Sequence, residues 1–505
     1  MNYNKCDDSL QFIQSVIPTP SAGGGRDLQH FRRCLALLGM TDVLRRMKQS
    51  LSVLCMSFLL LFSNLAQPFS AYTNEELDQL EQEFVQEINH SDAVLRDPIA
   101  HDYINHVGKR LAEFSQLSPP DFFIVKSNEI NAFAGPGGHI GVNTQLILES
   151  GTESELAGVM AHEMAHVRQH HLYRMMEHQK QMRVPMLASL LAGLALGIIN
   201  PALSTGALYG ALSGFAQDNI NFVRANEHEA DRIGINMLTK ANFDPHGMPD
   251  FFKKMQQATR YHYTENIPAI LRTHPLDEER IAEAENRCPP VDKKIIRDQT
   301  NFHLFKELIR TTVNTNPKQL LEYYRYQCAQ KTADIACRYG YALQYMQLNQ
   351  YTKALTLLKP MWTESPNNFY YAIAMAQSYE GSADPQAAVT ILQDLYANFP
   401  DSYAITLEYG NALLEAKQAS KAAAILLTGT RTFKRDIQMC NQLARAQAAN
   451  HTLGYAYFTL AECHILQGER RDAVRKLKLA QTYAQKDRLL RARIAAKIAE
   501  LTQKN

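Results

Sequence analysis

Apolar residues recur at every third or fourth position along most of the chain, a spacing that predicts a mainly α-helical protein. The first such stretch covers about residues 72–113. A long helix is predicted over residues 152–171, because the acidic side chains in its first turn suit the partial positive charge of a helix N-terminus. Further helices are predicted over about residues 224–240 and from within residues 273–280 onward.

A short extended region interrupts this helical pattern. Residues 122–125 read Phe-Phe-Ile-Val, which is typical of a strand. The run Gly-Pro-Gly-Gly at residues 135–138 indicates a turn, and short extended runs flank it within residues 131–143. The sequence therefore predicts a small β-sheet or hairpin next to the long helix.

Beyond about residue 300 the pattern is entirely helical and repeats. Small, apolar and proline residues recur at 34-residue steps: Ala342, Ala376 and Gly410; Ala354, Ala388 and Ala422; Leu358, Leu392 and Leu426; Pro366 and Pro400. A helix–turn–helix unit of this length is the signature of tetratricopeptide repeats, which serve as interaction scaffolds. A further unit is expected out of register with the others, marked by Ala461, Ala473, Leu477 and Ala480.

The N-terminal region has the layout of a targeting segment. From Met47 the chain has a basic Lys48, an apolar core over about residues 51–62, and then small and polar residues. This order predicts a secretory signal peptide over residues 47–71, because the apolar core is shorter than the ~20 residues that span a bilayer. An uncleaved signal anchor is the alternative. We interpret residues 1–46 as a non-structural extension upstream of the true start.

Net charge, a proline-rich break and the cysteines give further information on partners and domain boundaries. The formal net charge of the 505-residue chain is +1, so no global field favours nucleic acid, and we expect no nucleic-acid partner. Cys-Pro-Pro at residues 288–290 and two lysines soon after mark a boundary between domains over residues 72–295 and 300–505. The sparse cysteines form no CxxC motif, although Cys328 and Cys337 could pair in an oxidising compartment.

The candidate chemistry begins on the long helix. Residues 162–166 read His-Glu-Met-Ala-His, and histidines four positions apart face the same side of a helix. His162 and His166 can therefore bind one zinc ion while Glu163 lies beside the open coordination position. Taken alone, the motif could also be a helix with two solvated histidines.

A second predicted helix supplies a third ligand. Residues 226–231 read Asn-Glu-His-Glu-Ala-Asp, which places Glu227 and Asp231 one turn apart on one face. Glu227 can complete a His-His-Glu site that leaves the fourth position to water, and Asp231 can hold the far nitrogen of a ligand histidine. We predict one zinc ion per chain, bound by His162, His166 and Glu227.

These motifs resemble those of gluzincins and, among them, of the M48 (Ste24-like) family of zinc metallopeptidases. The resemblance covers about residues 75–290 and includes the Asn-Ala-Phe-Ala-Gly-Pro-Gly-Gly hairpin, the Thr-His-Pro run and Arg280-Ile281. It implies a mainly α fold: a gluzincin-type metallopeptidase domain with a small β-sheet or hairpin, followed by an α-helical tetratricopeptide repeat solenoid. Membrane-embedded relatives that cut prenylated substrates have several long spans, which this sequence does not show, so that activity is not transferred.

The expected reaction is hydrolysis of internal peptide bonds by a zinc metalloendopeptidase. Zinc would lower the pKa of water toward ~7 and polarise the scissile carbonyl. Glu163 would accept the water's proton and pass it to the leaving amine. Residues 139–142 are expected to form either an edge strand that pairs with an extended substrate or an ordinary buried hairpin strand.

His274 has three candidate roles. It could stabilise the developing oxyanion, occupy the open position of the zinc and hold the enzyme silent, or cap the following helix. Together with Glu163 and Asp231 it completes the set of candidate catalytic residues. His170 and His171 extend the motif helix and are expected on its solvated surface.

Two further segments have less specific patterns. Residues 186–216 form two small-residue, apolar runs, each too short to span a bilayer, and we expect them to be buried or to form a flap beside the active site. Membrane-surface contact is the less favoured alternative. Residues 469–505 carry 11 Lys or Arg against four acids, which favours a solvated helix face over an acidic partner or anionic lipid. Its other side would pack through Leu490, Ile494 and Ile498.

The resemblance implies a periplasmic enzyme that degrades or rescues misfolded or stalled outer-membrane proteins. Its repeats would recruit those clients or the outer-membrane assembly machinery, and membrane contact would be peripheral at most. One alternative is a chaperone or adaptor whose peptidase site is largely gated. A second is a small-peptide aminopeptidase, although the sequence shows no acidic motif for binding a free N-terminus.

Overall fold

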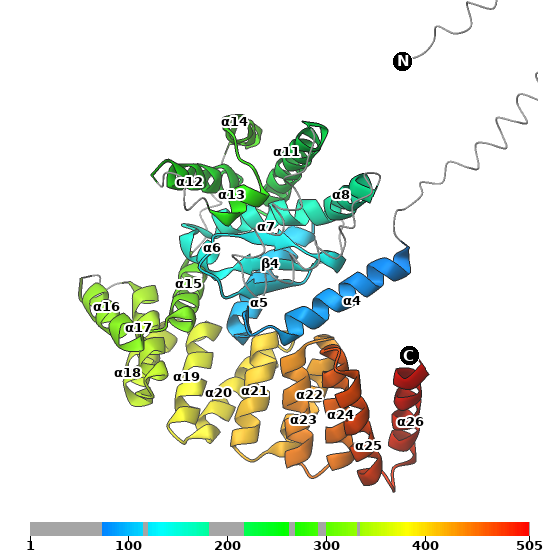
Figure 1. Ribbon diagram of the computed structural model, residues 1–505. Coiled ribbons are helices and arrows are strands. Elements are labelled where there is room, and N and C mark those ends of the chain that lie inside the picture. Colours follow the sequence, from blue (N-terminus) through cyan, green and yellow to red (C-terminus); the bar gives the residue numbers. More distant parts are fainter. Residues whose placement is uncertain are drawn as a thin grey trace, which may run out of the picture. The chain divides into compact units, whose positions relative to one another are not determined.

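The computed structural model describes residues 73–114, 120–180, 217–261, 268–290, 299–330 and 334–503 (Figure 1). The predicted extension, the signal peptide and the segment 186–216 lie outside these ranges. Within them the chain is mainly helical with one small β-sheet, as the sequence predicts. No helix in the described ranges is both long enough and apolar enough to cross a bilayer.

The first domain combines nine described α-helices with four short strands. The helices are α4 (Asn74–His90), α5 (Pro98–Ala112), α6 (Thr144–Glu149), α7 (Glu153–Arg168), α8 (His171–Lys180), α11 (Gln217–Lys240), α12 (Gly247–Tyr261), α13 (Ala269–Thr273) and α14 (Glu278–Arg287). The strands are β1 (Val94–Leu95), β2 (Phe122–Val125), β3 (Ala132–Ala134) and β4 (Ile140–Asn143).

The helical stretch predicted over residues 72–113 is two helices, α4 and α5. A new helix begins at Pro98, because Asp97 accepts a hydrogen bond from the Ala100 amide and proline suits the first helical position. Strand β1 occupies the gap between the two helices. The continuous apolar spacing therefore conceals a break that the Asp-Pro pair marks.

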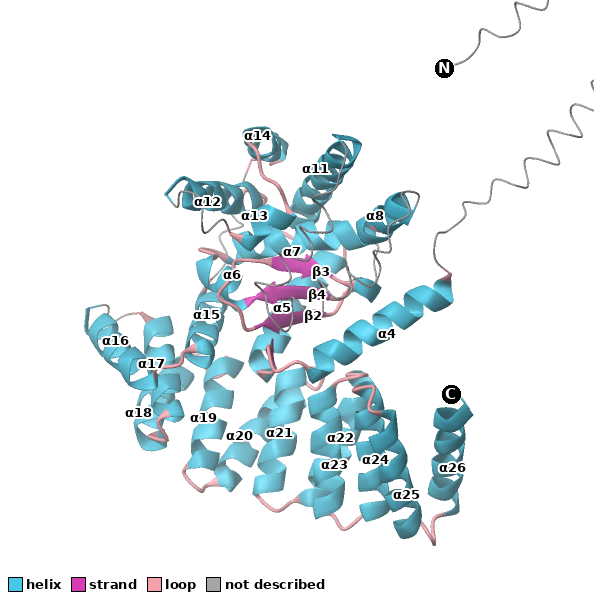
Figure 2. Cartoon of the chain, viewed as in Figure 1, coloured by secondary structure: helices cyan, strands magenta, loops and turns pink. Residues whose placement is uncertain are grey.

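The strands form one sheet in the order β1-β2-β4-β3. Figure 2 shows β4 between β2 and β3. β4 pairs with β2 in parallel and with β3 antiparallel, so it is an interior strand, and all of its residues are buried. The expectation that residues 139–142 form a substrate-binding edge is therefore wrong, and the alternative of a buried hairpin strand is confirmed. The free edge on this side belongs to β3.

Helix α7 is the centre of the first domain. All of its residues from Glu155 to Ala165 are buried, and α11 and α12 pack directly on it. A Cβ added at Gly234 of α11 would lie 3.2 Å from the backbone nitrogen of His162, and one at Gly158 would lie 2.9 Å from the Cα of Met248. Glycine at both positions thus lets the helices that carry the candidate site approach at backbone distance.

The second domain is an array of paired helices. These are α15 (Thr300–Val313), α16 (Pro317–Gln330), α17 (Ile335–Gln347), α18 (Tyr351–Glu364), α19 (Phe369–Gly381), α20 (Pro385–Asn398), α21 (Tyr403–Glu415), α22 (Ala419–Thr432), α23 (Ile437–Ala449), α24 (Leu453–Leu466), α25 (Arg470–Tyr483) and α26 (Arg488–Gln503).

The first residues of the helices confirm the predicted 34-residue period and show how many helices follow it. Helices α17, α19, α21 and α23 begin at successive 34-residue steps, and so do α18, α20, α22 and α24. Helices α23 and α24 add one more step to this ladder, whereas α25 begins at Arg470, one residue before the next step. The residues that indicated a unit out of register, Ala461, Ala473, Leu477 and Ala480, are buried together between α24 and α25.

Two disulfides each join consecutive helices of the array. Cys328–Cys337 links α16 to α17, as considered from the sequence, and Cys440–Cys463 links α23 to α24. Cys288 in the first domain is a free thiol. Disulfides persist in oxidising compartments, and each typically contributes about 2–4 kcal/mol to stability.

The repeats pack against helix α5 of the first domain (Figure 1). Asp102 on α5 caps α21 from outside, because its carboxylate accepts hydrogen bonds from three groups at the start of that helix. Tyr103 stacks on Phe305 of α15 with ring centroids 4.2 Å apart. One cluster of buried apolar residues runs through both domains. The groups that Asp102 binds are the Ser402 hydroxyl and the Tyr403 and Ala404 amides.

We expect Asp102→Ala to destabilise the protein by about 1–2 kcal/mol, because α21 loses its charged cap and three donors lose an acceptor. Thermal unfolding followed by circular dichroism would show a lower midpoint. Asp401→Ala is the matched control, since Asp401 is an exposed acid directly before the same capping site. Equal midpoints for the two variants would contradict this role of Asp102.

Candidate metal centre

The two motif histidines lie side by side on α7. The rings of His162 and His166 have centroids 4.7 Å apart, and their Nε2 atoms are 3.0 Å apart. Only 4% of His162 is exposed, so the pair sits in the interior of the domain. The four-residue spacing thus directs both Nε2 atoms toward one point.

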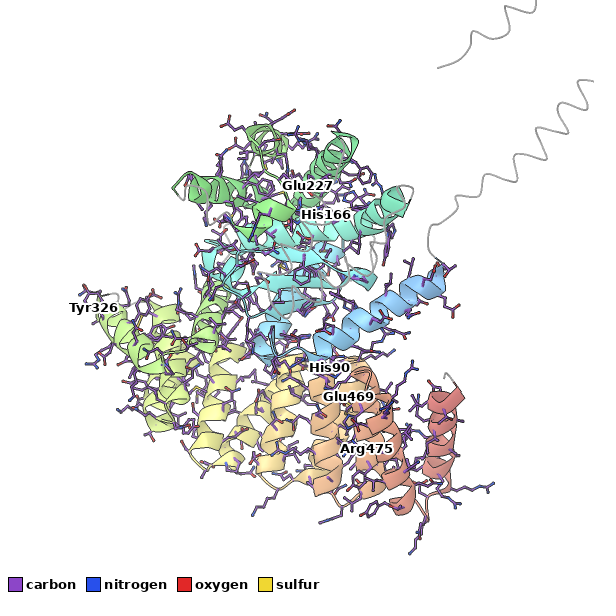
Figure 3. The ribbon with its side chains drawn as sticks, in the orientation of Figure 1. His90, His166, Glu227, Tyr326, Glu469 and Arg475 are labelled. Atoms are coloured by element: carbon purple, nitrogen blue, oxygen red, sulfur yellow. A yellow bond between two sulfur atoms is a disulfide. The ribbon has the colours of Figure 1, made fainter. Side chains whose placement is uncertain are left out.

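Helix α11 brings Glu227 to the same point. One carboxylate oxygen lies 3.3 Å from Nε2 of His162, and the other lies 3.5 Å from Nε2 of His166. Figure 3 shows Glu227 and His166 close together on the first domain. Burial acts to raise the pKa of Glu227, but the surrounding histidines, with His274 foremost, hold it well below its ordinary value.

The residues present fit a zinc ion. Donor atoms of His162, His166, Glu227 and His274 all lie within 4.8 Å of one another. Two imidazole nitrogens and a carboxylate oxygen are a donor set that catalytic zinc sites use, with a further position left open. We infer that the first three residues would hold the metal, as the sequence predicts.

A chain of buried charges supports His162 from behind. Asp231 lies 2.9 Å from its Nδ1, and Arg280 makes two hydrogen bonds of 2.8 and 2.9 Å to Asp231. Arg280 also lies 3.0 Å from Glu227 and is only 2% exposed. Burial acts to lower the pKa of His162, but its bonds to Asp231 and Glu227 outweigh that effect and raise it to about 10.

Glu163 lies beside the cluster and faces the adjoining cleft. Its side chain is buried, and its Oε1 has no hydrogen-bond partner among the described residues. The His274 ring lies close by, with its Nε2 3.3 Å from this oxygen. Glu163 therefore has an acceptor available in the cleft.

His274 points into the donor cluster rather than toward the next helix. Its Nδ1 lies 3.1 and 3.2 Å from the two oxygens of Glu227 and 3.3 Å from Nε2 of His162. Asp277, and not His274, caps α14 through the Arg280 amide. The helix-capping alternative for His274 is therefore wrong.

His171 is the second residue whose expected place is wrong. His170 adopts a left-handed φ of 52°, so α7 ends at Arg168 and the chain turns before α8. This turn carries His171 back to His166, with the two Nδ1 atoms 2.8 Å apart, and it is 4% exposed. Its other nitrogen lies 3.2 Å from Glu229. Only His170 is on the solvated surface.

Sequence reasoning missed the contacts of Arg280 and His171 for one reason: each depends on a turn. Arg280 was noticed only as part of a family motif, and nothing in its local spacing places it against α11. A charged residue in the first turn of a helix is usually solvated. The available signal for His171 was its position five residues after His166.

A cleft of about 420 Å³ adjoins the metal centre. One wall is β3 with the turn that follows it, and the other wall is formed by α8. Glu163 and Glu227 are the only carboxylates among the described residues that line it. The site therefore consists of a donor cluster at one side of a mostly apolar cleft.

Known proteins resemble both domains of this chain. The family described as Peptidase family M48 matches residues 98–288, and a Tetratricopeptide repeat family matches residues 381–448. The chain is 33% identical over 424 residues to the beta-barrel assembly-enhancing protease of Escherichia coli (strain K12), across 83% of this chain and 86% of that protein. It is 32% identical over 426 residues to the putative beta-barrel assembly-enhancing protease of Vibrio cholerae, across 83% and 87%.

A more distant relative matches a smaller part of the chain. The mitochondrial metalloendopeptidase OMA1 of Schizosaccharomyces pombe is 27% identical over 197 residues, across 38% of this chain and 54% of that protein. The bacterial relatives thus match both domains of this chain.

We expect Asp231→Asn to weaken zinc binding about 10- to 100-fold, because the amide keeps the shape but not the charge that orients and polarises His162. Competition with a chromophoric chelator would measure the change. Asp250→Asn is the control, since Asp250 is an exposed acid on α12 outside the site. If both variants bound zinc as the parent does, the supporting role of Asp231 would be refuted.

Proposed function

Because the chain belongs to peptidase family M48, we propose that it is a periplasmic zinc endopeptidase that degrades or rescues stalled outer-membrane proteins. One observation carries this proposal: His162, His166 and Glu227 converge beside Glu163 at a cleft along the free edge of β3. The names of the bacterial relatives, which refer to beta-barrel assembly, support the choice of substrate.

Catalysis then divides between the metal and this chain's own residues. When bound by His162, His166 and Glu227, zinc supplies a Lewis acid that polarises the scissile carbonyl and lowers the pKa of water. Glu163 accepts the proton of the attacking water on its unpartnered oxygen and returns it to the leaving amine. Asp231 fixes the ring of His162, so that its Nε2 stays directed at the metal.

The free edge of β3 supports binding of an extended segment. Residues of this edge strand line the cleft, so a peptide could add to the sheet there as a further strand, held by backbone hydrogen bonds. The cleft has no described carboxylate apart from Glu163 and Glu227, which the reaction and the metal require. This absence of another acid to bind a free amine favours an endopeptidase over an aminopeptidase.

The location of His274 favours a gated site. Its Nδ1 is within 3.3 Å of atoms of both Glu227 and His162, which is where a further metal ligand would lie. We infer that His274 occupies the open position until substrate displaces it. The rival role, stabilising the oxyanion, requires the ring to face the scissile carbonyl instead.

The repeats supply the recruitment function in this proposal. Repeat arrays expose long binding surfaces, and the array here extends from α15 to α26. It would bring unfolded clients or the outer-membrane assembly machinery to the cleft, with membrane contact peripheral at most. The two disulfides support an oxidising compartment such as the periplasm.

A chaperone or adaptor is the second candidate function. The same His274 contacts favour it, because a site that is usually closed would leave binding by the repeats as the main activity. Cleavage kinetics separate the two candidates.

We expect Glu163→Gln to lower cleavage of an N-blocked, internally quenched peptide by about 10²- to 10⁴-fold, because the general base is lost. Zinc content should stay at one ion per chain, since Glu163 is not a proposed ligand. Parent protein that binds zinc and yet cleaves neither this peptide nor casein would favour the chaperone. Parent protein that contains no zinc would refute the proposal of a zinc endopeptidase.

Replacing His274 distinguishes its two roles. If the ring blocks the open position, His274→Ala raises kcat/KM for casein several-fold, because the site no longer has to expel it. If the ring stabilises the oxyanion, kcat falls by about 10²-fold or more. His246→Ala, at a partly buried histidine outside the site, serves as the control.

A further inference from the structure

A second large cavity lies in the repeat domain, and none of its lining residues belongs to the metal centre. It has a volume of about 540 Å³ and is bordered by α22, α23, α24 and α26. Its described lining contains five basic side chains and only two acidic ones. The basic residues are Arg431, Lys434, Arg435, Arg493 and Lys497, and the acidic ones are Asp436 and Glu462.

The basic groups are only partly neutralised by their surroundings. Arg431 and Lys434 are exposed, and neither has an ion-pair partner among the described residues. Arg493 lies over the ring of Phe458, with its guanidinium carbon 4.6 Å from the ring centroid. Asp436, by contrast, is already engaged, since its carboxylate accepts from the Met439 amide and the Tyr403 hydroxyl. The cavity is therefore positively charged overall.

The floor of the cavity is apolar. Leu443 and Phe458 are both buried, and Ile465 and Leu466 add further aliphatic surface. A ligand that fits must therefore combine negative charge with apolar side chains. A volume of about 540 Å³ falls within the usual range for clefts that enclose small ligands, roughly 300–1,000 Å³.

We propose that this cavity, which we call the basic pocket, binds an extended acidic peptide segment that also carries apolar side chains. Carboxylates of the segment would pair with Arg431, Lys434 and Arg435, while its apolar side chains would contact Phe458 and the aliphatic floor. This assignment names the chemistry of the partner that the repeats recruit, so it rests on the recruitment role proposed above.

The recess favours a peptide over an anionic membrane surface. Binding to a bilayer surface needs basic side chains that project outward together, whereas these residues border a hollow between four helices. An extended peptide can enter such a hollow and reach its apolar floor.

Arg435 connects the basic pocket to the catalytic cleft. It forms an ion pair of 3.0 Å with Glu81 on α4. The side chain of Glu81 packs against Gly137, in the turn that lines the cleft, and lies 3.7 Å from His139. A peptide carboxylate that takes Arg435 therefore competes with Glu81 and frees a side chain at the cleft.

Fluorescence anisotropy with the full-length Glu163→Gln protein tests the proposal without cleavage. The probe is a blocked, labelled nonapeptide of three Glu-Glu-Phe units, compared with the same peptide carrying Gln in place of Glu. We expect only the acidic peptide to bind, with weaker affinity at higher salt. Arg431→Ala with Lys434→Ala should raise its Kd about tenfold.

The matched control replaces Arg475 and Lys478 on α25, two exposed basic residues outside the pocket, with alanine (Arg475 is labelled in Figure 3). We expect their loss to leave Kd unchanged, and Glu81→Gln to lower Kd about threefold because Arg435 is released. Equal effects of the control and pocket variants, or equal binding of both peptides, would overturn the proposal. Binding to anionic phosphatidylglycerol vesicles alone would overturn it too, in favour of lipid.

These outcomes are independent of the catalytic proposal. Cleavage of the quenched peptide by the parent protein tests the endopeptidase, and anisotropy with the Glu163→Gln variant tests the basic pocket. Either one can fail while the other stands.

Discussion

The buried ion pair between Arg280 and Asp231 is the contact on which the rest of the site depends. It joins α14 to α11, and Asp231 in turn reaches His162 on α7. Arg280 is 2% exposed and Asp231 is 4% exposed, so water solvates neither charge. Removing one partner of such a pair typically costs about 3–5 kcal/mol, because the other charge stays buried and unpaired. The three helices are thereby held in the one arrangement that satisfies these charges.

Other contacts join these three helices to the cleft and to the repeats. Helix α7 packs against β3, whose free edge borders the cleft, and glycines let α11 and α12 approach α7 closely. Helix α5 connects the same core to the repeats through Asp102. The repeats therefore pack on the first domain through specific contacts as well as covalent linkage.

Residues that act through local spacing could be predicted from the sequence. Four-residue spacing placed His162 and His166 on one face of a helix, and a 34-residue period placed Ala342 and Ala376 in successive helix contacts. Residues whose position depends on a turn or on strand pairing could not be placed from the sequence. Residues 139–142 were misjudged as a possible edge because strand order depends on pairing with β2, which lies earlier in the chain. The burial of His171 could not be predicted, because the left-handed φ at His170 is a property of the backbone that the pattern of apolar residues does not reveal.

The charges in the interior explain why this arrangement calls for a dication. The site buries three carboxyl groups, from Glu163, Glu227 and Asp231, and one guanidinium, from Arg280, which contacts Glu227 and Asp231. Protons on the histidines would balance only part of this charge: burial lowers the pKa of His166 well below its ordinary value, and the proton that the raised pKa of His162 favours would occupy a donor atom. A divalent cation at the converging donors would balance the charge and bind the lone pairs at once. The same negative excess that makes the empty cluster costly would therefore drive metal binding.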